Sequence, residues 1–138
     1  MSRSSHLLLL RSFAWLALLA LCSAYIVGGI TKLFDFSGAV AEMTHFGLVP
    51  AMPFAAATIA LELGASALIL IGRHRWLGAL ALALFTLAAS MLANRFWLLA
   101  GMDRFMAKNA FFEHLGLAGA FVLIALQDRV SKGQRHES

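Results

Sequence analysis

The chain has 138 residues, of which 61% are hydrophobic and only 13% are charged, so it lacks the polar shell that a soluble domain of this length needs. Its formal net charge of +4 comes from Lys and Arg residues that lie singly or in pairs between apolar runs, without the aromatic-interleaved basic face that binds nucleic acid. The composition therefore indicates a single membrane domain in contact with the lipid bilayer and without a nucleic-acid partner.

The first predicted membrane span, residues 12–33, has no charged residue between Arg11 and Lys32, and about 20 such residues cross a bilayer as a helix. A basic N-terminus before an apolar run is also typical of a signal peptide, but this run exceeds the usual stretch of about 7 to 15 residues. We therefore expect it to be retained. Ala24, Gly28 and Lys32 recur every four residues, so they share a helix face. Lys32 either reaches the mouth of the bundle along this face or snorkels to the interface.

The second predicted span, residues 50–72, carries one charged residue, Glu62, close to its middle. A charge at this depth costs about 2.5 to 3.5 kcal/mol, whereas each Leu or Ile returns about 0.3 to 0.6 kcal/mol, so the span can still insert. Thr58 and Ser66 lie four residues to either side of Glu62 and share its face. We predict that this face points into the bundle. There Glu62 either contributes to a functional pocket or pairs with a cation as a structural lock.

The third predicted span, residues 76–97, follows the second after only the short turn 73–75, so the two spans should form an antiparallel hairpin. Gly72 suits the end of the preceding helix. Ser90 and Asn94 lie four residues apart on one stripe that also contains Thr86, and this stripe is expected to meet the face of Glu62. The alternative is that these hydroxyl and amide groups only hold the helices together through interhelical hydrogen bonds, each of which contributes roughly 0.6 kcal/mol.

The fourth predicted span, residues 109–127, begins with two ionisable residues and is followed by a polar, frayed tail, residues 128–138. Gly116 and Gly119 give this span a face of small residues that suits helix packing. The outer mouth of the bundle is expected to gather Lys32, Arg95, Glu113 and His114 above Glu62. This cluster either serves a site or only locks the helices through ion pairs.

Both chain termini are predicted to be cytoplasmic, because the side of the membrane with more Lys and Arg faces the cytoplasm. With the N-terminus inside, seven basic residues are cytoplasmic: Arg3, Arg11, Arg73, Arg75, Arg129, Lys132 and Arg135. Four are outside: Lys32, Arg95, Arg104 and Lys108.

Metal and thiol chemistry find no support in the sequence. The single cysteine, Cys22, lies in the middle of an apolar span, and no CxxC or Cys/His spacing predicts a metal site. A haem held by two histidines needs a second histidine facing His114, but the other histidines lie in predicted loops or tails. We predict no metal ligands.

Four segments together resemble the DoxX family of small bacterial inner-membrane proteins over residues 20–126. They are GGITK at the end of the first span, ELGASALILIG in the second, NRFW after the third and KNAFFEHLGLAGAFVLIA through the fourth. The positions that match the family pattern are Gly29, Lys32, Glu62, Gly64, Gly72, Phe96, Trp97, Asn109, Gly116 and Gly119. One departure is Ala65, where the family commonly has a second glycine after the glutamate.

The resemblance implies an all-α bundle of four transmembrane helices in the cytoplasmic membrane. The family takes its name from a subunit associated with thiosulfate:quinone oxidoreductase, while most short members have no established activity. It therefore favours a non-catalytic membrane subunit or scaffold with a polar site around Glu62. One alternative is a membrane subunit of an oxidoreductase assembly that binds quinone or another small apolar ligand.

In that alternative the carboxylate exchanges the proton that accompanies electron transfer, and a separate redox protein carries the electrons. A carrier of a small solute is the second alternative, and a homo-oligomer is compatible with each. No segment outside the predicted spans is large enough to form a catalytic domain, so we expect no enzyme activity of the chain on its own.

Overall fold

The computed structural model describes residues 3–136, which form five α-helices and one short 3-10 helix. In chain order they are α1 (Arg3–Phe34), α2 (Phe36–His45), α3 (Ala51–Ile71), α4 (Arg75–Ala93), η1 (Phe96–Leu98) and α5 (Gly101–His136). Four of these helices, α1, α3, α4 and α5, are long and apolar enough to cross a membrane, which confirms the predicted all-α, four-span architecture. The side chains of Arg3 and Arg135, which enter the charge count above, lie outside the described part.

Helices α1 and α5 are both longer than their predicted spans. The structure differs from the predicted elements in the C-terminal tail and after the first span. α5 continues through the polar tail as far as His136, so the expected fraying after residue 127 is wrong for the described residues. The ten-residue helix α2 was not predicted at all. Its N-cap is Asp35, whose carboxylate accepts a hydrogen bond from the Gly38 amide (2.9 Å) and thereby satisfies an otherwise unpaired donor of the first turn.

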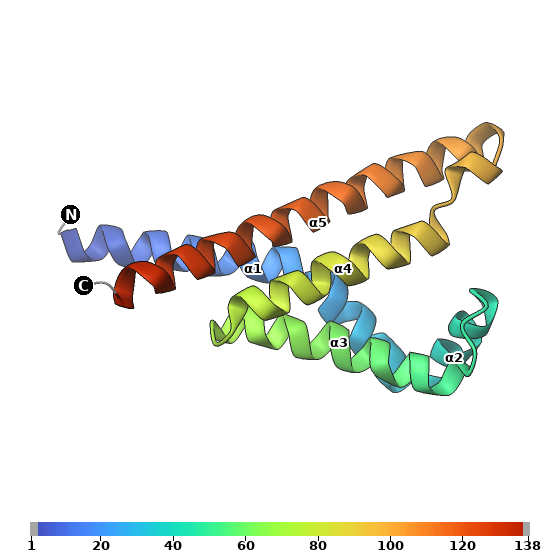
Figure 1. The fold of residues 1–138 in the computed structure, drawn as a ribbon, viewed down its shortest axis with the longest axis horizontal. Helices are drawn as coiled ribbons and strands as arrows, with labels where there is room; N and C mark the ends of the chain where they lie inside the picture. The colour runs from blue at the N-terminus through green and yellow to red at the C-terminus, as the bar shows by residue number, and fades with distance from the viewer. Residues whose placement is uncertain (1–2, 137–138) are drawn as a thin grey trace.

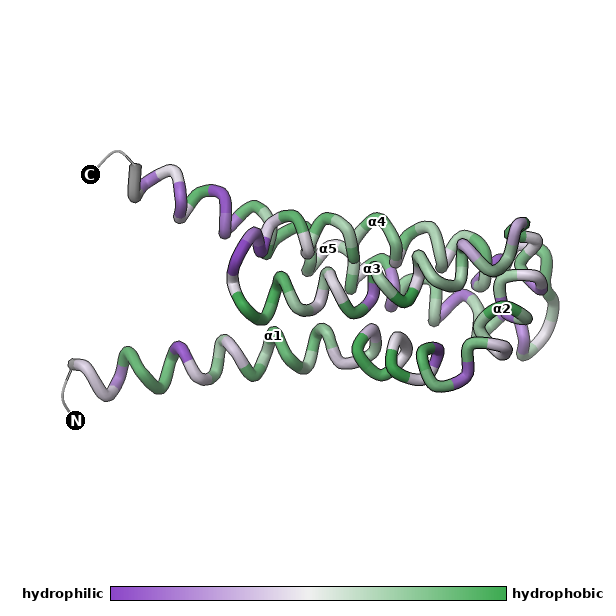
Figure 2. The backbone as a smooth tube through the Cα atoms, turned by 90° about the horizontal axis from the view of Figure 1, so that it is seen from below, coloured by the Kyte–Doolittle hydropathy of each residue, from purple (hydrophilic) through white to green (hydrophobic). Residues whose placement is uncertain are grey.

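The helices run back and forth between two ends of the molecule (Figure 1). The described chain begins and ends on the side of the α3–α4 turn, while α2 and η1 lie at the opposite end. α3 packs against both α1 and α4, α4 packs along α5, and α2 covers α3. The hydropathy-coloured tube shows apolar residues along most of the long helices, as lipid-facing helices require (Figure 2).

The α3–α4 hairpin is confirmed. Gly72 ends α3 in the left-handed conformation with a φ of 82°, which a glycine adopts without steric cost. Gly78 lets α4 approach α3, because a Cβ there would lie 2.6 Å from the Ala65 carbonyl oxygen. Ala65 is itself buried in this crossing, so its methyl group fills space at the point where the family commonly has glycine.

Glycines also set the approach of α1 to α3, but they do not do so for α5. A Cβ on Gly29 would lie 2.7 Å from Leu63 Cγ, so the two helices pack closely at this point. By contrast, nothing lies within 4 Å of a Cβ built on Gly116 or Gly119. α5 packs through Ala118, Phe121 and Ala125 instead, so its small-residue face does not serve packing within the described chain.

Candidate functional site

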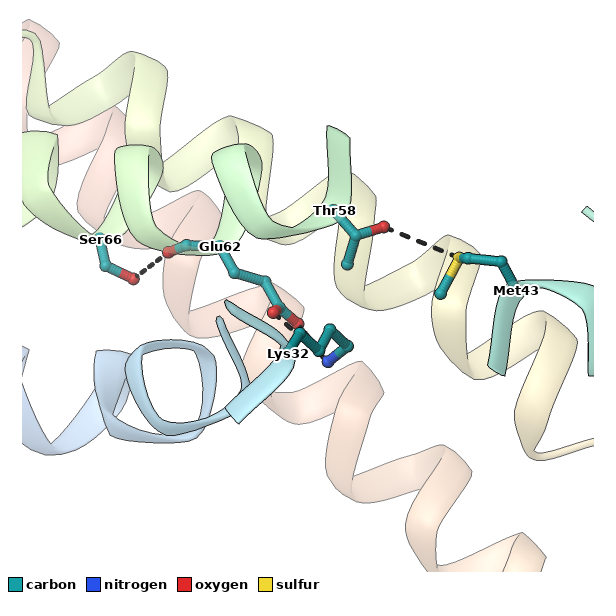
Figure 3. Close-up of polar contacts among 5 residues, drawn as sticks. All are labelled: Lys32, Met43, Thr58, Glu62 and Ser66. Carbon is teal, nitrogen blue, oxygen red and sulfur yellow. Dashed lines mark hydrogen bonds and ion pairs between the residues drawn. The ribbon is translucent and has the colours of Figure 1, made fainter. Parts of the chain in front are cut away.

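Glu62 forms an ion pair with Lys32 inside the bundle (Figure 3). The Lys32 Nζ atom lies 3.4 Å from each carboxylate oxygen, and the Glu62 side chain is only 7% exposed. Gly28 leaves room for the pair, because a Cβ on it would lie 3.5 Å from the carboxylate oxygens and from Nζ. The predicted inward orientation of Glu62 is confirmed. Ala24 and Lys32 also line the cavity beside Glu62, and Gly28 lies next to the pair, which favours the alternative in which Lys32 reaches the bundle along this face.

The ion pair forms part of the wall of a cavity of about 510 Å³ that receives side chains from all five α-helices. Most of this wall is apolar and comes from Ala, Leu, Met and Phe side chains. Its polar or ionisable members are Tyr25, Lys32, Glu42, Thr58, Glu62, Thr86 and His114. The cavity therefore offers a large apolar surface with a few polar groups, among them the Lys32–Glu62 pair.

The hydroxyl groups in this wall are held by local hydrogen bonds. Thr86 donates to the Leu82 carbonyl (2.6 Å) and hydrogen-bonds the Tyr25 hydroxyl, which ties α1 to α4. Thr58 makes a weak contact of 4.0 Å with the sulfur of Met43 on α2, as Figure 3 shows. A weakly bonded hydroxyl can turn toward a ligand at little cost.

His114 is oriented by its own helix. Its Nδ1 atom donates to the Ala110 carbonyl at 2.6 Å, so Nε2 is the ring nitrogen that remains for a ligand. The prediction placed this histidine at the mouth of the bundle, and the structure brings it to the cavity wall together with Lys32.

Three other predicted residues are buried or partly buried but do not line the cavity. Ser66 donates to the Glu62 carbonyl oxygen (2.6 Å), one turn back along α3, and so shares the face of Glu62 without reaching its carboxylate. Asn94 donates to Ser90 (3.1 Å) within α4. Ser90 and Asn94 therefore do not reach the cavity, but Thr86 of the same stripe lines it together with Glu62. The ion-pair partner of the carboxylate comes from α1.

Arg95 and Glu113 also lie outside the site. Both are exposed, neither lines the cavity, and within residues 3–136 neither forms an ion pair. The expected cluster of four ionisable residues at the mouth is thus reduced to Lys32 and His114, the two of the four that line the cavity.

The comparisons with known proteins agree with this architecture. The family model described as DoxX matches residues 7–95, which is more than half of the chain and includes both members of the ion pair. This chain belongs to the DoxX family. It is therefore a DoxX-type integral membrane protein, and the resemblance noted in the sequence is confirmed.

One curated relative of this DoxX protein is the inner membrane protein YphA of Escherichia coli (strain K12). The two are 26% identical over 111 residues, which cover 80% of this chain and 79% of the relative. No solved structure matches the chain.

Sequence reasoning missed two polar residues of this DoxX cavity, Glu42 and Tyr25. Glu42 belongs to α2, whose only sequence signals were the capping residue Asp35 and the apolar pair Ala39 and Met43 four residues apart. Tyr25 is the one tyrosine of the chain and lies in the middle of the first span, where a hydroxyl needs a partner inside the bundle. That position was a usable signal.

The cavity wall combines hydrogen-bond donors and acceptors with apolar surface. Lys32 and His114 offer hydrogen-bond donors, and Glu62 and Glu42 offer acceptors. Within the described residues, no group of three or more His, Cys, Asp or Glu side chains is placed to hold a metal ion. The chemistry of the cavity wall is thus that of hydrogen bonding and charge in apolar surroundings.

Proposed function

We propose that this DoxX protein is a non-catalytic subunit of the bacterial inner membrane that binds a small, largely apolar ligand with one polar end. The observation that carries the proposal is the buried Lys32–Glu62 ion pair in the wall of a cavity of about 510 Å³. The ligand's polar end lies against this pair and its apolar part against the Ala, Leu and Phe side chains.

The size and chemistry of the cavity support this proposal. Ligand sites in proteins commonly have volumes of about 300 to 1,000 Å³, with mostly apolar walls and a few polar groups that orient the ligand. Here the polar groups come from α1, α2, α3, α4 and α5, so a bound molecule would touch every long helix. Such a ligand would also stabilise the four-span bundle that binds it.

A quinone is the second candidate, in an assembly with a separate redox protein. Its ring is apolar and its carbonyl oxygens accept hydrogen bonds, which Lys32, Thr58 and His114 can donate. Glu62 would exchange the proton that accompanies reduction. The electrons would come from a partner that holds a flavin, haem or iron–sulfur centre.

The test compares three forms of the purified protein: wild type, Glu62→Gln and the control Glu113→Gln. Glu113 is also a carboxylate near the η1 end, but it is exposed and does not line the cavity. Small molecules that co-purify are extracted and quantified by mass spectrometry. We expect one apolar species, near one per chain, in wild type and Glu113→Gln and a depleted amount in Glu62→Gln.

Equal amounts in all three forms would argue against ligand binding at Glu62 and leave the ion pair as a structural lock. A recovered species that is not a quinone would remove the redox candidate while supporting the first proposal. The two candidates are thereby distinguished in one experiment.

We also propose that residues 1–138 form one domain with both termini in the cytoplasm and with spans near 12–33, 50–72, 76–97 and 109–127. The support is the excess of Lys and Arg on the side of the 73–75 turn. Two exposed arginines give a matched test, Arg73→Cys at the turn and Arg104→Cys at the start of α5, both in a Cys22→Ala background. A membrane-impermeant thiol reagent applied to spheroplasts should label Cys at 104 and spare Cys at 73, and the opposite pattern would reverse the topology.

A further inference from the structure

Positive charge gathers at the end of the bundle opposite to the ligand cavity. Arg73 and Arg75 lie where α3 turns into α4, and Arg129 and Lys132 lie on the last turns of α5. We call these four residues the basic platform. Figure 2 shows the hydrophilic α3–α4 turn and the hydrophilic C-terminal part of α5 on the side where the chain termini lie.

Three of the four cations are held in place by neighbouring groups. The Arg75 Nε atom donates to the Ile69 carbonyl (2.9 Å), and the Arg129 guanidinium carbon lies 4.9 Å from the centre of the Trp76 ring. Lys132 pairs with Asp128 (2.7 Å).

Asp128 also accepts the Trp76 amide (3.1 Å) and is the one carboxylate among the residues that line the two cavities at this end. Four cations and one carboxylate leave an excess of three positive charges.

Two cavities open at the basic platform and share Gly72 and Lys132 in their walls. One, of about 580 Å³, is lined by Arg73, Trp76 and Arg129 among others. The other, of about 710 Å³, lies between α1 and α5 and has an apolar wall that includes Ala14, Leu18, Leu21 and Ile124. Along α1 this wall extends from position 14 to position 21. The rise over these seven residues is roughly 10 Å, so the wall reaches that far into the membrane. A polar, basic opening therefore continues into an apolar slot.

We propose that the basic platform and the slot between α1 and α5 bind one anionic phospholipid. Its phosphate lies against Arg73, Arg129 and Lys132, and one acyl chain runs along Ala14, Ala17 and Leu21. Arginine recognises phosphate through paired N–H donors, and basic pockets between transmembrane helices accept anionic headgroups. A free phosphate would use the cations but leave the slot empty. A zwitterionic lipid would fill the slot but carries a compensating cation.

This site is separate from the ligand cavity at Glu62, because the two have no lining residue in common. The lipid inference therefore does not depend on the proposed function. We expect the bound lipid to connect α1 and α5 at the end where the cavity lies between these two helices.

The test measures lipid binding to the full-length protein in detergent by native mass spectrometry, with phosphatidylglycerol and phosphatidylcholine as probes. We expect wild type to prefer phosphatidylglycerol. The double variant Arg73→Gln/Arg129→Gln should lose about thirtyfold of this affinity, since each basic residue near a lipid surface contributes on the order of a factor of five to six. The matched control is Arg95→Gln/Arg104→Gln, which removes two exposed arginines from the η1 end and should stay within about twofold of wild type.

Each other outcome contradicts the proposal in a defined way. Equal affinity of wild type for both lipids would exclude an anionic-lipid site, and this comparison needs no variant. An equal loss in both double variants would indicate a general charge effect. Displacement of the lipid by a large excess of inorganic phosphate would indicate a free-anion site. Ala17→Phe, which fills the slot, should weaken phosphatidylglycerol binding, and unchanged binding would remove the acyl-chain contact.

Discussion

Replacing Lys32 by Met tests the coupling between Lys32 and Glu62, because it removes the charge while retaining most of the side-chain volume. Nζ lies 3.4 Å from both carboxylate oxygens, so the Coulomb attraction is about 5 kcal/mol at an effective dielectric constant of about 20. Desolvation of the two charges offsets part of this attraction. Removing one partner of a buried pair nevertheless costs about 3 to 5 kcal/mol, because the other charge is left uncompensated.

The two single variants should differ in their cost. In Lys32→Met the carboxylate of Glu62, whose side chain is only 7% exposed, loses its cation. In Glu62→Gln the remaining ammonium belongs to a long side chain that is 17% exposed and can extend toward the end of α1. We expect Lys32→Met to lower the free energy of unfolding by about 3 to 5 kcal/mol and Glu62→Gln by about 1 to 2 kcal/mol.

The double variant Lys32→Met/Glu62→Gln decides whether the pair is coupled. It leaves no uncompensated charge, so its stability should lie close to that of Glu62→Gln, and the coupling energy should then equal the cost of Lys32→Met alone, about 3 to 5 kcal/mol. The assay is unfolding in detergent, with SDS titrated into mild micelles and helix content followed by circular dichroism. Additive losses within about 0.5 kcal/mol would refute the reasoning, because independent sites are additive to that degree.

Two further predictions concern the packing of α4 and the capping of α2. Gly78→Ala should lower the free energy of unfolding by about 1 to 3 kcal/mol, because its Cβ would lie 2.6 Å from the Ala65 carbonyl oxygen. The control Gly119→Ala, whose Cβ would have nothing within 4 Å, should be neutral or slightly stabilising in the same unfolding assay. Hydrogen bonds from the Gly38 amide and the Ser37 hydroxyl lower the pKa of Asp35 below its ordinary value of 3.8. The ionised cap therefore stabilises α2 fully at pH values above 3.8, and this stabilisation is lost as the pH falls through the lowered pKa. Hydrogen exchange of the α2 amides, corrected for intrinsic rates, should show this loss of protection in wild type and not in Asp35→Ala, and equal pH dependence in the two would contradict the assignment.

Local patterns in the sequence were enough to predict the spans and the inward face of α3. Membrane insertion depends on the hydropathy of about 20 consecutive residues, and helical periodicity places Thr58, Glu62 and Ser66 on one face without reference to any other helix. The same reasoning placed the hairpin, because a three-residue turn leaves two long helices no arrangement but an antiparallel one. These features depend on residues that are neighbours in the chain.

The tertiary structure decided which residues from different helices meet. Glu62 had several cations within sequence reach, and it pairs with Lys32 rather than Arg95 because α1 crosses α3 closely at Gly29. Helix α2 is too short to be stable alone, and it forms where Ala39 and Met43 pack against Ala55 of α3, which brings Glu42 to the cavity. The face through which α5 packs depends on its partner α4, so the positions of the α5 glycines did not predict that face. Crossing geometry is a property of several helices together, and no single segment encodes it.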